Sequence, residues 1–554
     1  MKVTMQAILK IVCVAITACM TICTFASTVT AAEQTTKYFT HTAKSGDTLI
    51  GLADRYLIEK KDWQSIQSEN KIPNPRRIKP GSEIRIPIAL MRSEPATAKV
   101  IAVQGPVETA TGALEKGAVL SEGAAIKTGE NGFVTLQLAD GSTIVVQSKS
   151  QVKLEVARVL ANTGGVPSTT VGLTSGRVES SVEKRKNQGA RFEISTPTSN
   201  MGVRGTRFRV SSDESGKISR GEVLEGVVAV GSTTPAPKPL DLGAGFGSVV
   251  EEGKAASAPI ALLAAPDLSA AATLQERLVL RFKFADVAGA TGYRGQVATD
   301  SAFNNLLADE VFKTPEAKFA NLDDGQYFFR ARAIDKVALE GRDAVRAFKL
   351  KARPEPPFTS EPKNKNKLAA EKVEFKWANA VEAGSYRFQL ARNADFSQTI
   401  SDERGVVLSG SGPGFSPAAS IKPGDYFWRV ASVRPDGDVG PFGDVQAFTL
   451  KAMPQAPNPP KEEGNRVGFS WSGEAGQTFD FQLASDAGFK TLVQEKKLAQ
   501  PEISIEKPSE AGTYYMRYRS IDADGFVGPY SSAQTIEVKA NRWWLLLFLV
   551  PFLL

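Results

Sequence analysis

Reactive side chains are scarce in this 554-residue sequence. It contains one histidine, His41, and three cysteines (Cys13, Cys19 and Cys23), and all three cysteines lie within the first 25 residues. If that segment is removed, the remaining chain has no thiol and a single imidazole. Thiolate zinc sites, disulfides and cysteine–histidine nucleophile pairs then lack their atoms. A lone histidine has no catalytic or metal partner, so we expect His41 to be an exposed strand residue.

The N-terminal segment has the pattern of a secretory signal. Lys2 and Lys10 supply positive charge, residues 11–26 are apolar, and small residues lead up to Ala32. This order is typical of a signal peptide over residues 1–32, cleaved after Ala32. It predicts an exported protein of the periplasm or cell envelope. In the alternative, Ile16-Thr17-Ala18-Cys19 acts as a lipobox and Cys19 carries a lipid anchor, although the apolar run continues past Cys19.

The opposite end of the chain is a run of apolar residues, 543–554, that follows Arg542. As a helix, twelve residues span roughly 18 Å, which is less than the ~30 Å hydrocarbon core of a bilayer. Trp543 and Trp544 beside Arg542 resemble an interfacial anchor. Two interpretations stay open for this tail (residues 542–554), namely contact with a membrane or partner, and packing against the last domain.

Charge is moderately basic, with a net value of +7. Loss of Lys2 and Lys10 with the signal lowers the net charge to +5. This balance is compatible with anionic envelope polymers. The sequence has no aromatic-basic motif of the kind that binds nucleic acid, and we expect neither a nucleic-acid partner nor a cofactor.

Residues 37–88 carry the most specific pattern. Apolar residues at helical spacing predict one helix from Leu49 to Tyr56 and a second around Trp63 to Gln67. Turns are expected at Lys44 to Asp47 and at Pro80-Gly81, and alternation of apolar residues predicts a closing strand. These elements together predict a small α/β module.

The segments from Lys44 to Leu49 and from Asn70 to Pro75 resemble the LysM domain, and the resemblance extends over about fifty residues. Ala43 departs from it, because the family more often has a branched apolar residue there. The resemblance implies two strands flanking two helices, and a groove between two loops that binds N-acetylglucosamine polymers, chiefly peptidoglycan or chitin. The residues that the resemblance places in this groove are Gly46, Asp47, Thr48, Leu49, Asn70, Lys71, Ile72, Pro73 and Asn74.

From residue 99 to 232 the apolar pattern changes to period two. Short alternating segments separated by glycine-containing turns predict an all-β domain with one buried face. Short segments such as Leu138 to Ser142 and Gly202 to Val210 resemble the FecR domain. Members of that family relay iron-transport signals through a cytoplasmic N-terminal region, which this chain replaces with an export signal and the LysM-like module. We therefore expect a binding domain here, in which Arg204 holds backbone carbonyls or a ligand anion.

A linker is expected over residues 233–265, where prolines alternate at first and alanines follow. Three repeats come next, at 266–351, 354–451 and 455–539. The motif that begins at Tyr293 recurs at Tyr386 and Phe479, at intervals of 93 residues. Each repeat also has a Tyr-x-x-Arg strand, and the last two share a Gly-Pro-aromatic turn. The arginines of these strands are Arg330, Arg429 and Arg517, and the turns are Gly440-Pro441-Phe442 and Gly528-Pro529-Tyr530.

The repeats resemble fibronectin type III sandwiches. Their arginines form either a basic stripe for an anionic polymer or pairs with acids on neighbouring strands, and we expect the pairs. The whole chain is predicted to be multidomain and mainly β. We expect a non-enzymatic envelope protein that binds peptidoglycan and presents its β domains to an envelope partner. The alternatives are an envelope signal sensor, and a peptidoglycan hydrolase that works with carboxylates alone.

Overall fold

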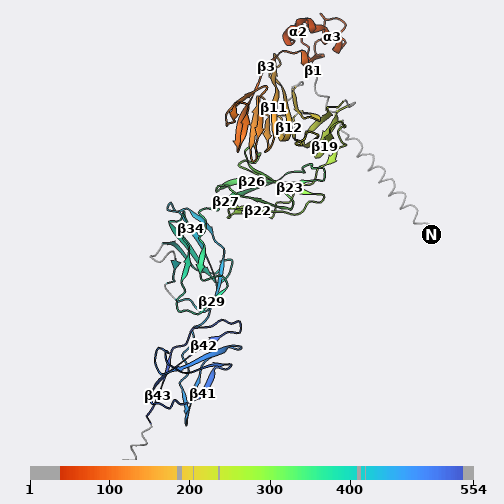
Figure 1. Ribbon diagram of the computed structural model, residues 1–554. Coiled ribbons are helices and arrows are strands. Elements are labelled where there is room, and N and C mark those ends of the chain that lie inside the picture. The colour runs from red at the N-terminus through yellow and green to blue at the C-terminus, as the bar shows by residue number, and fades with distance from the viewer. Residues whose placement is uncertain are drawn as a thin grey trace, which may run out of the picture. The chain divides into compact units, whose positions relative to one another are not determined.

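The computed structural model describes residues 38–183, 190–203, 205–234, 238–407, 414–417 and 420–540. The predicted export signal with Cys19, Arg204 and the apolar tail lie outside these residues. The chain divides into two compact units, residues 1–350 and 351–554, and each is described by itself. The fold is mainly β, which confirms the predicted class (Figure 1). No helix in the described ranges is long and apolar enough to cross a membrane.

The first module of the chain is small and mixed α/β. Its elements are β1 (Tyr38–Thr42), α2 (Leu49–Tyr56), the 3-10 turns η1 (Lys60–Asp62) and η2 (Ile88–Leu90), α3 (Trp63–Asn70) and β2 (Glu83–Pro87). The two strands are antiparallel, with His41 opposite Ile84. Thr48 caps α2, because its hydroxyl accepts a hydrogen bond from the Gly51 N–H over 3.1 Å. Both helices lie where the apolar spacing predicts them.

The first module packs on a hairpin of the domain that follows. Leu160 and Val166, at the end of β11 (Gln151–Leu160) and the start of β12 (Val166–Ser181), belong to the same buried apolar cluster as the module's own core. The amide of Asn162 also donates to the carbonyl of Arg55 over 2.8 Å. Buried apolar contact of this kind fixes the module to the hairpin.

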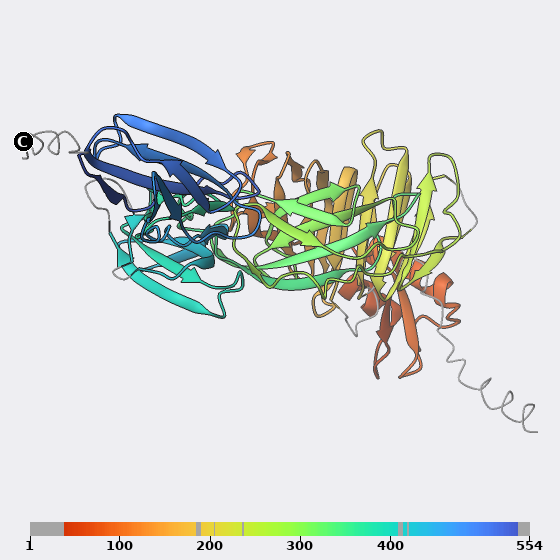
Figure 2. The ribbon, with the colours of Figure 1, turned by 90° about the horizontal axis from the view of Figure 1, so that it is seen from below.

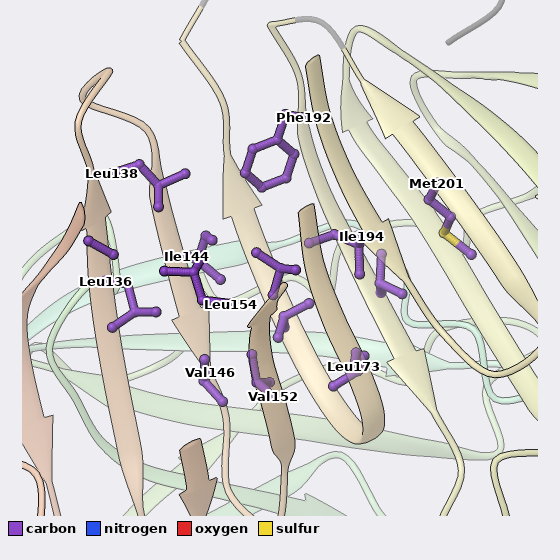
Figure 3. Close-up of a cluster of buried hydrophobic side chains, with 14 of the residues drawn as sticks. Leu136, Leu138, Ile144, Val146, Val152, Leu154, Leu173, Phe192, Ile194 and Met201 are labelled. Carbon is purple, nitrogen blue, oxygen red and sulfur yellow. The ribbon is translucent and has the colours of Figure 1, made fainter. Parts of the chain in front are cut away.

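The middle domain consists of two sheets that share β12. Its other strands are β3 (Ser93–Pro95), β4 (Thr97–Gln104), β5 (Val107–Thr109), β6 (Gly112–Ala113), β7 (Val119–Ser121), β8 (Ala125–Thr128), β9 (Phe133–Leu138), β10 (Thr143–Val146), β11, β13 (Arg191–Ser195), β14 (Ser199–Val203), β15 (Arg207–Ser212), β16 (Ile218–Glu225), β17 (Val227–Ser232), β18 (Leu240–Gly243), β19 (Phe246–Glu251) and β20 (Ile260–Ala261). The first half of β12 pairs with β11 and β13, and its second half pairs with β10 and β15. Apolar side chains from both sheets form one core, part of which is drawn in Figure 3.

The predicted linker over 233–265 is replaced in the structure by strands β18 to β20. β18 pairs with β17, and β19 pairs with β16, so this segment extends both sheets. Leu242 and Val250 are fully buried in the domain core. Gly245 has a φ of 84°, which a tight turn between β18 and β19 requires. The glycines therefore mark a hairpin and not a flexible connection.

The first sandwich belongs to the same unit as the middle domain. It has a five-stranded sheet in the order β21-β27-β26-β23-β24 and a pair, β22-β25. Its strands are β21 (Leu274–Gln275), β22 (Leu280–Lys283), β23 (Gly292–Ala298), β24 (Leu306–Phe312), β25 (Glu316–Phe319), β26 (Gly325–Ile334) and β27 (Ala344–Leu350). Figure 2 shows its green strands against the orange and yellow strands of the middle domain, an arrangement that direct hydrogen bonds support.

The second unit contains two further sandwiches, whose sheets are β28-β30-β33 with β29-β36-β34-β31-β32, and β37-β38-β41 with β40-β39-β42-β43. Their strands are β28 (Thr359–Glu361), β29 (Asn366–Leu368), β30 (Phe375–Trp377), β31 (Ser385–Ala391), β32 (Thr399–Val406), β33 (Gly414–Phe415), β34 (Gly424–Val433), β35 (Val439–Phe442), β36 (Gln446–Leu450), β37 (Lys461–Glu463), β38 (Arg466–Ser470), β39 (Thr478–Ala484), β40 (Leu492–Leu498), β41 (Glu502–Glu506), β42 (Gly512–Ile521) and β43 (Gln534–Val538). The early aromatics Trp377 and Trp471 are buried in the two cores.

The strand arginines of the second and third sandwiches stack between two aromatic rings. The guanidinium of Arg429 lies 3.9 Å from the ring centre of Phe396 and 4.2 Å from that of Phe442. In the third sandwich, Arg517 lies 3.9 Å from the ring centres of both Phe489 and Tyr530. Each guanidinium also donates to a glutamine on the neighbouring strand, Gln389 or Gln482. These arginines are thus held by ring stacking together with a hydrogen bond to an amide oxygen.

Candidate functional site

Two loops of the first module lie side by side at the start of α2. They are residues 44–48 and residues 71–75, and we refer to them as the loop pair. The backbone N–H of Leu49 donates to the carbonyl of Pro75 over 2.9 Å, which joins the two loops directly. Lys71 ends α3 in the left-handed conformation, with a φ of 51°, and so turns the second loop toward the first. The structure therefore brings together the two segments that the LysM resemblance implied.

The nine predicted glycan-binding residues differ in what their side chains do. All but Leu49 have exposed or half-exposed surface, namely Gly46, Asp47, Thr48, Asn70, Lys71, Ile72, Pro73 and Asn74. Leu49 is fully buried, so its side chain packs the core. The Asn70 amide donates to the carbonyls of Ile66 and Arg85 and accepts from the Arg85 N–H, each over 2.7 Å. These bonds occupy Asn70 in tying α3 to β2.

Asp47 holds the first loop from within. Its Oδ2 accepts hydrogen bonds from the Lys44 N–H and from Nε2 of His41, each over 2.8 Å. Burial acts to raise the pKa of Asp47, but the bonds from His41 and Lys44 outweigh it, and the pKa lies below its usual value. The ionised carboxylate therefore stabilises the turn at Gly46.

His41 is buried, so the expectation of an exposed histidine was wrong. The residue is 7% exposed and lies between Asp47 and Tyr56, whose hydroxyl is 3.2 Å from Nδ1. Nε2–H donates to the carboxylate, and the Tyr56 hydroxyl lies within hydrogen-bond distance of Nδ1 on the other side of the ring. Alternation along β1 explains the burial, since Phe39 and Ala43 on the same face are buried too. That alternation was visible in the sequence.

A second polar cluster, which sequence reasoning missed, lies where the middle domain meets the first sandwich. Glu179, Arg209 and Glu222 of the middle domain are each less than 10% exposed. Buried charges of this kind need partners, and those partners come from a segment more than a hundred residues further along the chain. Their distance in the sequence left no local signal.

Comparison with known proteins gives two family matches. The LysM domain family matches residues 41–87, and the FecR protein family matches residues 124–229. Comparison with curated proteins gives no match.

Several solved structures are similar in part. The FN1-FN3 domains of chicken CNTN1 are 13% identical, with a TM-score of 0.20, and the match covers 50% of this chain and 99% of that one. The fibronectin(III)-like modules of Clostridium thermocellum CbhA are 14% identical, with a TM-score of 0.20, 33% of this chain and 95% of that one.

A putative anti-sigma factor from Parabacteroides distasonis ATCC 8503 is also similar, at 14% identity and a TM-score of 0.21. That match covers 25% of this chain and 59% of the other. This protein contains a LysM domain at residues 41–87 and a FecR domain at residues 124–229, followed by fibronectin type III-like sandwiches.

Proposed function

We propose that this protein is a non-enzymatic component of the cell envelope that binds peptidoglycan, or a related N-acetylglucosamine polymer, through the loop pair of its LysM domain. The observation that carries the proposal is the hydrogen bond from Leu49 to Pro75, because it fixes two loops with exposed surface beside each other. Loops fixed before binding lose little conformational entropy when a ligand arrives. LysM and FecR domains are typically non-catalytic, which favours binding over hydrolysis.

The loop pair suits a chain of acetamido sugars. Gly46 leaves backbone peptide groups accessible, since it has no side chain and no atom lies within 4 Å of where one would begin. Ile72 and Pro73 offer apolar surface for a sugar face, and the Asn74 side chain offers amide hydrogens. We assign supporting roles to Leu49, which is buried, and to Asp47 and Asn70, whose side chains are engaged in bonds within the domain. Contact roles go to Gly46, Thr48, Lys71, Ile72, Pro73 and Asn74.

Sedimentation with purified peptidoglycan tests this proposal. The full chain is compared with the double variant Ile72→Ala and Asn74→Ala, for which we expect at least tenfold weaker binding. The matched control is Lys61→Ala with Gln64→Ala, two exposed residues of the same domain outside the loop pair. Equal binding by all three proteins would reject the assignment. Release of soluble muropeptides would instead favour the hydrolase.

A second candidate function, the passing of an envelope signal to a protein partner, is favoured by the FecR domain at residues 124–229. A sensor must change its FecR surface when glycan binds. Hydrogen exchange of the full chain, with and without soluble peptidoglycan fragments, distinguishes the two roles. Changes confined to the LysM domain support attachment, and changes that reach the FecR domain support sensing. The tail at 542–554 would add membrane contact to either role.

A further inference from the structure

The first sandwich differs from the other two at two positions on one face. The strand bridges Ile334–Glu340, Val433–Val439 and Ile521–Val527 occur at the same place in the three sandwiches. Glu340 therefore stands where the other repeats have Val439 and Val527. Three residues further on, Asp343 stands where the others have the aromatic residues Phe442 and Tyr530.

Because Asp343 replaces an aromatic residue, the strand arginine of the first sandwich loses one of the two rings that stack on its counterparts. Arg330 is the counterpart of Arg429 and Arg517, and it still lies 4.1 Å from the ring centre of Phe303. Arg330 also donates to both oxygens of Glu179 of the middle domain, over 3.1 and 2.9 Å. The strand arginine of the first sandwich thus contacts one ring and an acid of another domain, where its counterparts contact two rings.

The two acidic residues contact arginines of both domains. Asp343 accepts from Arg332 of the first sandwich over 2.6 Å and from Arg207 of the middle domain over 2.8 Å. Glu340 accepts from Arg332 over 2.6 Å and from Arg177 of the middle domain over 2.5 Å. Each carboxylate therefore bridges the boundary between the domains.

Arg209 of the middle domain completes the contact at the backbone. Its guanidinium donates to the carbonyls of Glu340 and Gly341 over 2.8 and 2.7 Å. Glu222 of the middle domain accepts from the Glu340 N–H over 3.1 Å. Both side chains are at most 4% exposed, so this part of the boundary excludes water.

The charges at this boundary depend on one another. Glu179 and Glu340 are buried, which acts to raise the pKa of each, but the surrounding arginines hold both pKa values well below the usual range. Buried ion pairs offset their desolvation only when they remain complete, and removal of one partner leaves an uncompensated charge. The contact therefore discriminates strongly between a sandwich with the acidic pair and one without it.

We propose that strands β12, β15 and β16 of the FecR domain form a docking surface for a fibronectin-like sheet, and that Glu340 and Asp343 select the first sandwich as its occupant. The second and third sandwiches have valine and an aromatic ring at these positions, so they offer no carboxylate to the arginines of the FecR domain.

The proposal is tested with a variant whose first sandwich has the residues of the second at these two positions. In the full chain, Glu340→Val with Asp343→Phe supplies Arg330 with a second ring, as in the other sandwiches, and removes both bridging carboxylates. We expect the sandwich to remain folded while amide hydrogens of β12, β15 and β16 exchange at least tenfold faster. Unchanged exchange in a folded double variant would overturn the proposal. If that variant does not fold, Asp343→Asn provides the same comparison with a smaller expected increase.

A reciprocal variant serves as the control. Phe442→Asp places a carboxylate on the second sandwich, and it should loosen that sandwich without changing exchange in β12. Analytical sedimentation of the unmodified protein shows whether the docked first sandwich belongs to the same chain or to a second copy. A monomer with a protected surface supports docking within one chain, whereas a dimer that loses protection on dilution would show that two copies exchange their first sandwiches, which would contradict it.

Discussion

His41 donates a hydrogen bond from Nε2 to Oδ2 of Asp47 over 2.8 Å, and the two residues flank the turn at Gly46. The bond links the inner face of β1 to the first loop of the loop pair. Both side chains are at most 10% exposed. The first loop is thereby supported by a buried polar contact and not by its own sequence alone.

Replacement of His41 by phenylalanine should loosen the first loop while the domain stays folded. The substitution leaves Asp47 without its buried donor, which costs about 1–3 kcal/mol of stability. We expect a lower midpoint for thermal unfolding of the LysM domain and weaker sedimentation with peptidoglycan. Thr42→Ala, at the exposed neighbouring position, is the control and should change neither measurement.

The lowered pKa of Asp47 predicts an acid-sensitive turn. A carboxyl group whose pKa is lower in the folded state stabilises the fold at pH values above its unfolded pKa, about 3.9. This contribution is lost as the pH falls through the folded pKa. Hydrogen exchange at residues 44–48 should therefore increase below about pH 4. In Asp47→Asn it should be fast already at neutral pH, and a parallel pH response in both proteins would contradict the assignment.

Asp402 in the second sandwich should behave in the same way. It accepts two bonds from Arg387, over 2.8 and 2.6 Å, and one from Gln389, and Arg387 lowers its pKa to about 2. Asp402→Asn should cost about 1 kcal/mol at neutral pH, the upper end for a partly exposed pair. The difference from the unchanged protein should shrink between about pH 4 and pH 2. Urea unfolding as a function of pH measures it.

Gly176 predicts a sharp effect in the middle domain. It has a φ of 95°, and a Cβ there would lie 2.5 Å from the Cα of Ser150. Gly176→Ala should therefore destabilise the domain by more than 2 kcal/mol, because it adds a steric clash to backbone strain. Gly164→Ala is a matched control, since its φ of 76° carries the strain but no atom lies within 4 Å. Equal losses of thermal stability in the two variants would show that the steric clash with Ser150 does not contribute.

Local patterns predicted most of the fold. The spacing of Leu49 and Tyr56 was sufficient for α2, and the recurrence of Tyr293 in later repeats was sufficient to divide the C-terminal part into sandwiches. The glycines of residues 243–247 misled us, because the same residues suit a flexible linker and the tight turn between β18 and β19. Composition alone does not distinguish these two uses.

The site was less predictable than the fold. Leu49 and Asn70 lie at the ends of helices that border the loop pair, but which side chains are free for a ligand depends on partners such as Arg85 that the motif does not include. The absence of a Gly-Pro-aromatic turn from the first sandwich was visible in the sequence. The carboxylate that binds Arg330 instead, that of Glu179, lies more than 150 residues earlier in the sequence. The packing of two domains brings it close to Arg330.

One strand touches both neighbours of the middle domain. Val166 at one end of β12 lies in the core shared with the LysM domain, and Glu179 near the other end binds the first sandwich. Between these two contacts β12 passes from one sheet to the other at Gly176, whose φ is 95°. If the LysM domain is tethered to the cell wall, a displacement of that domain reaches the contact with the first sandwich through this one strand.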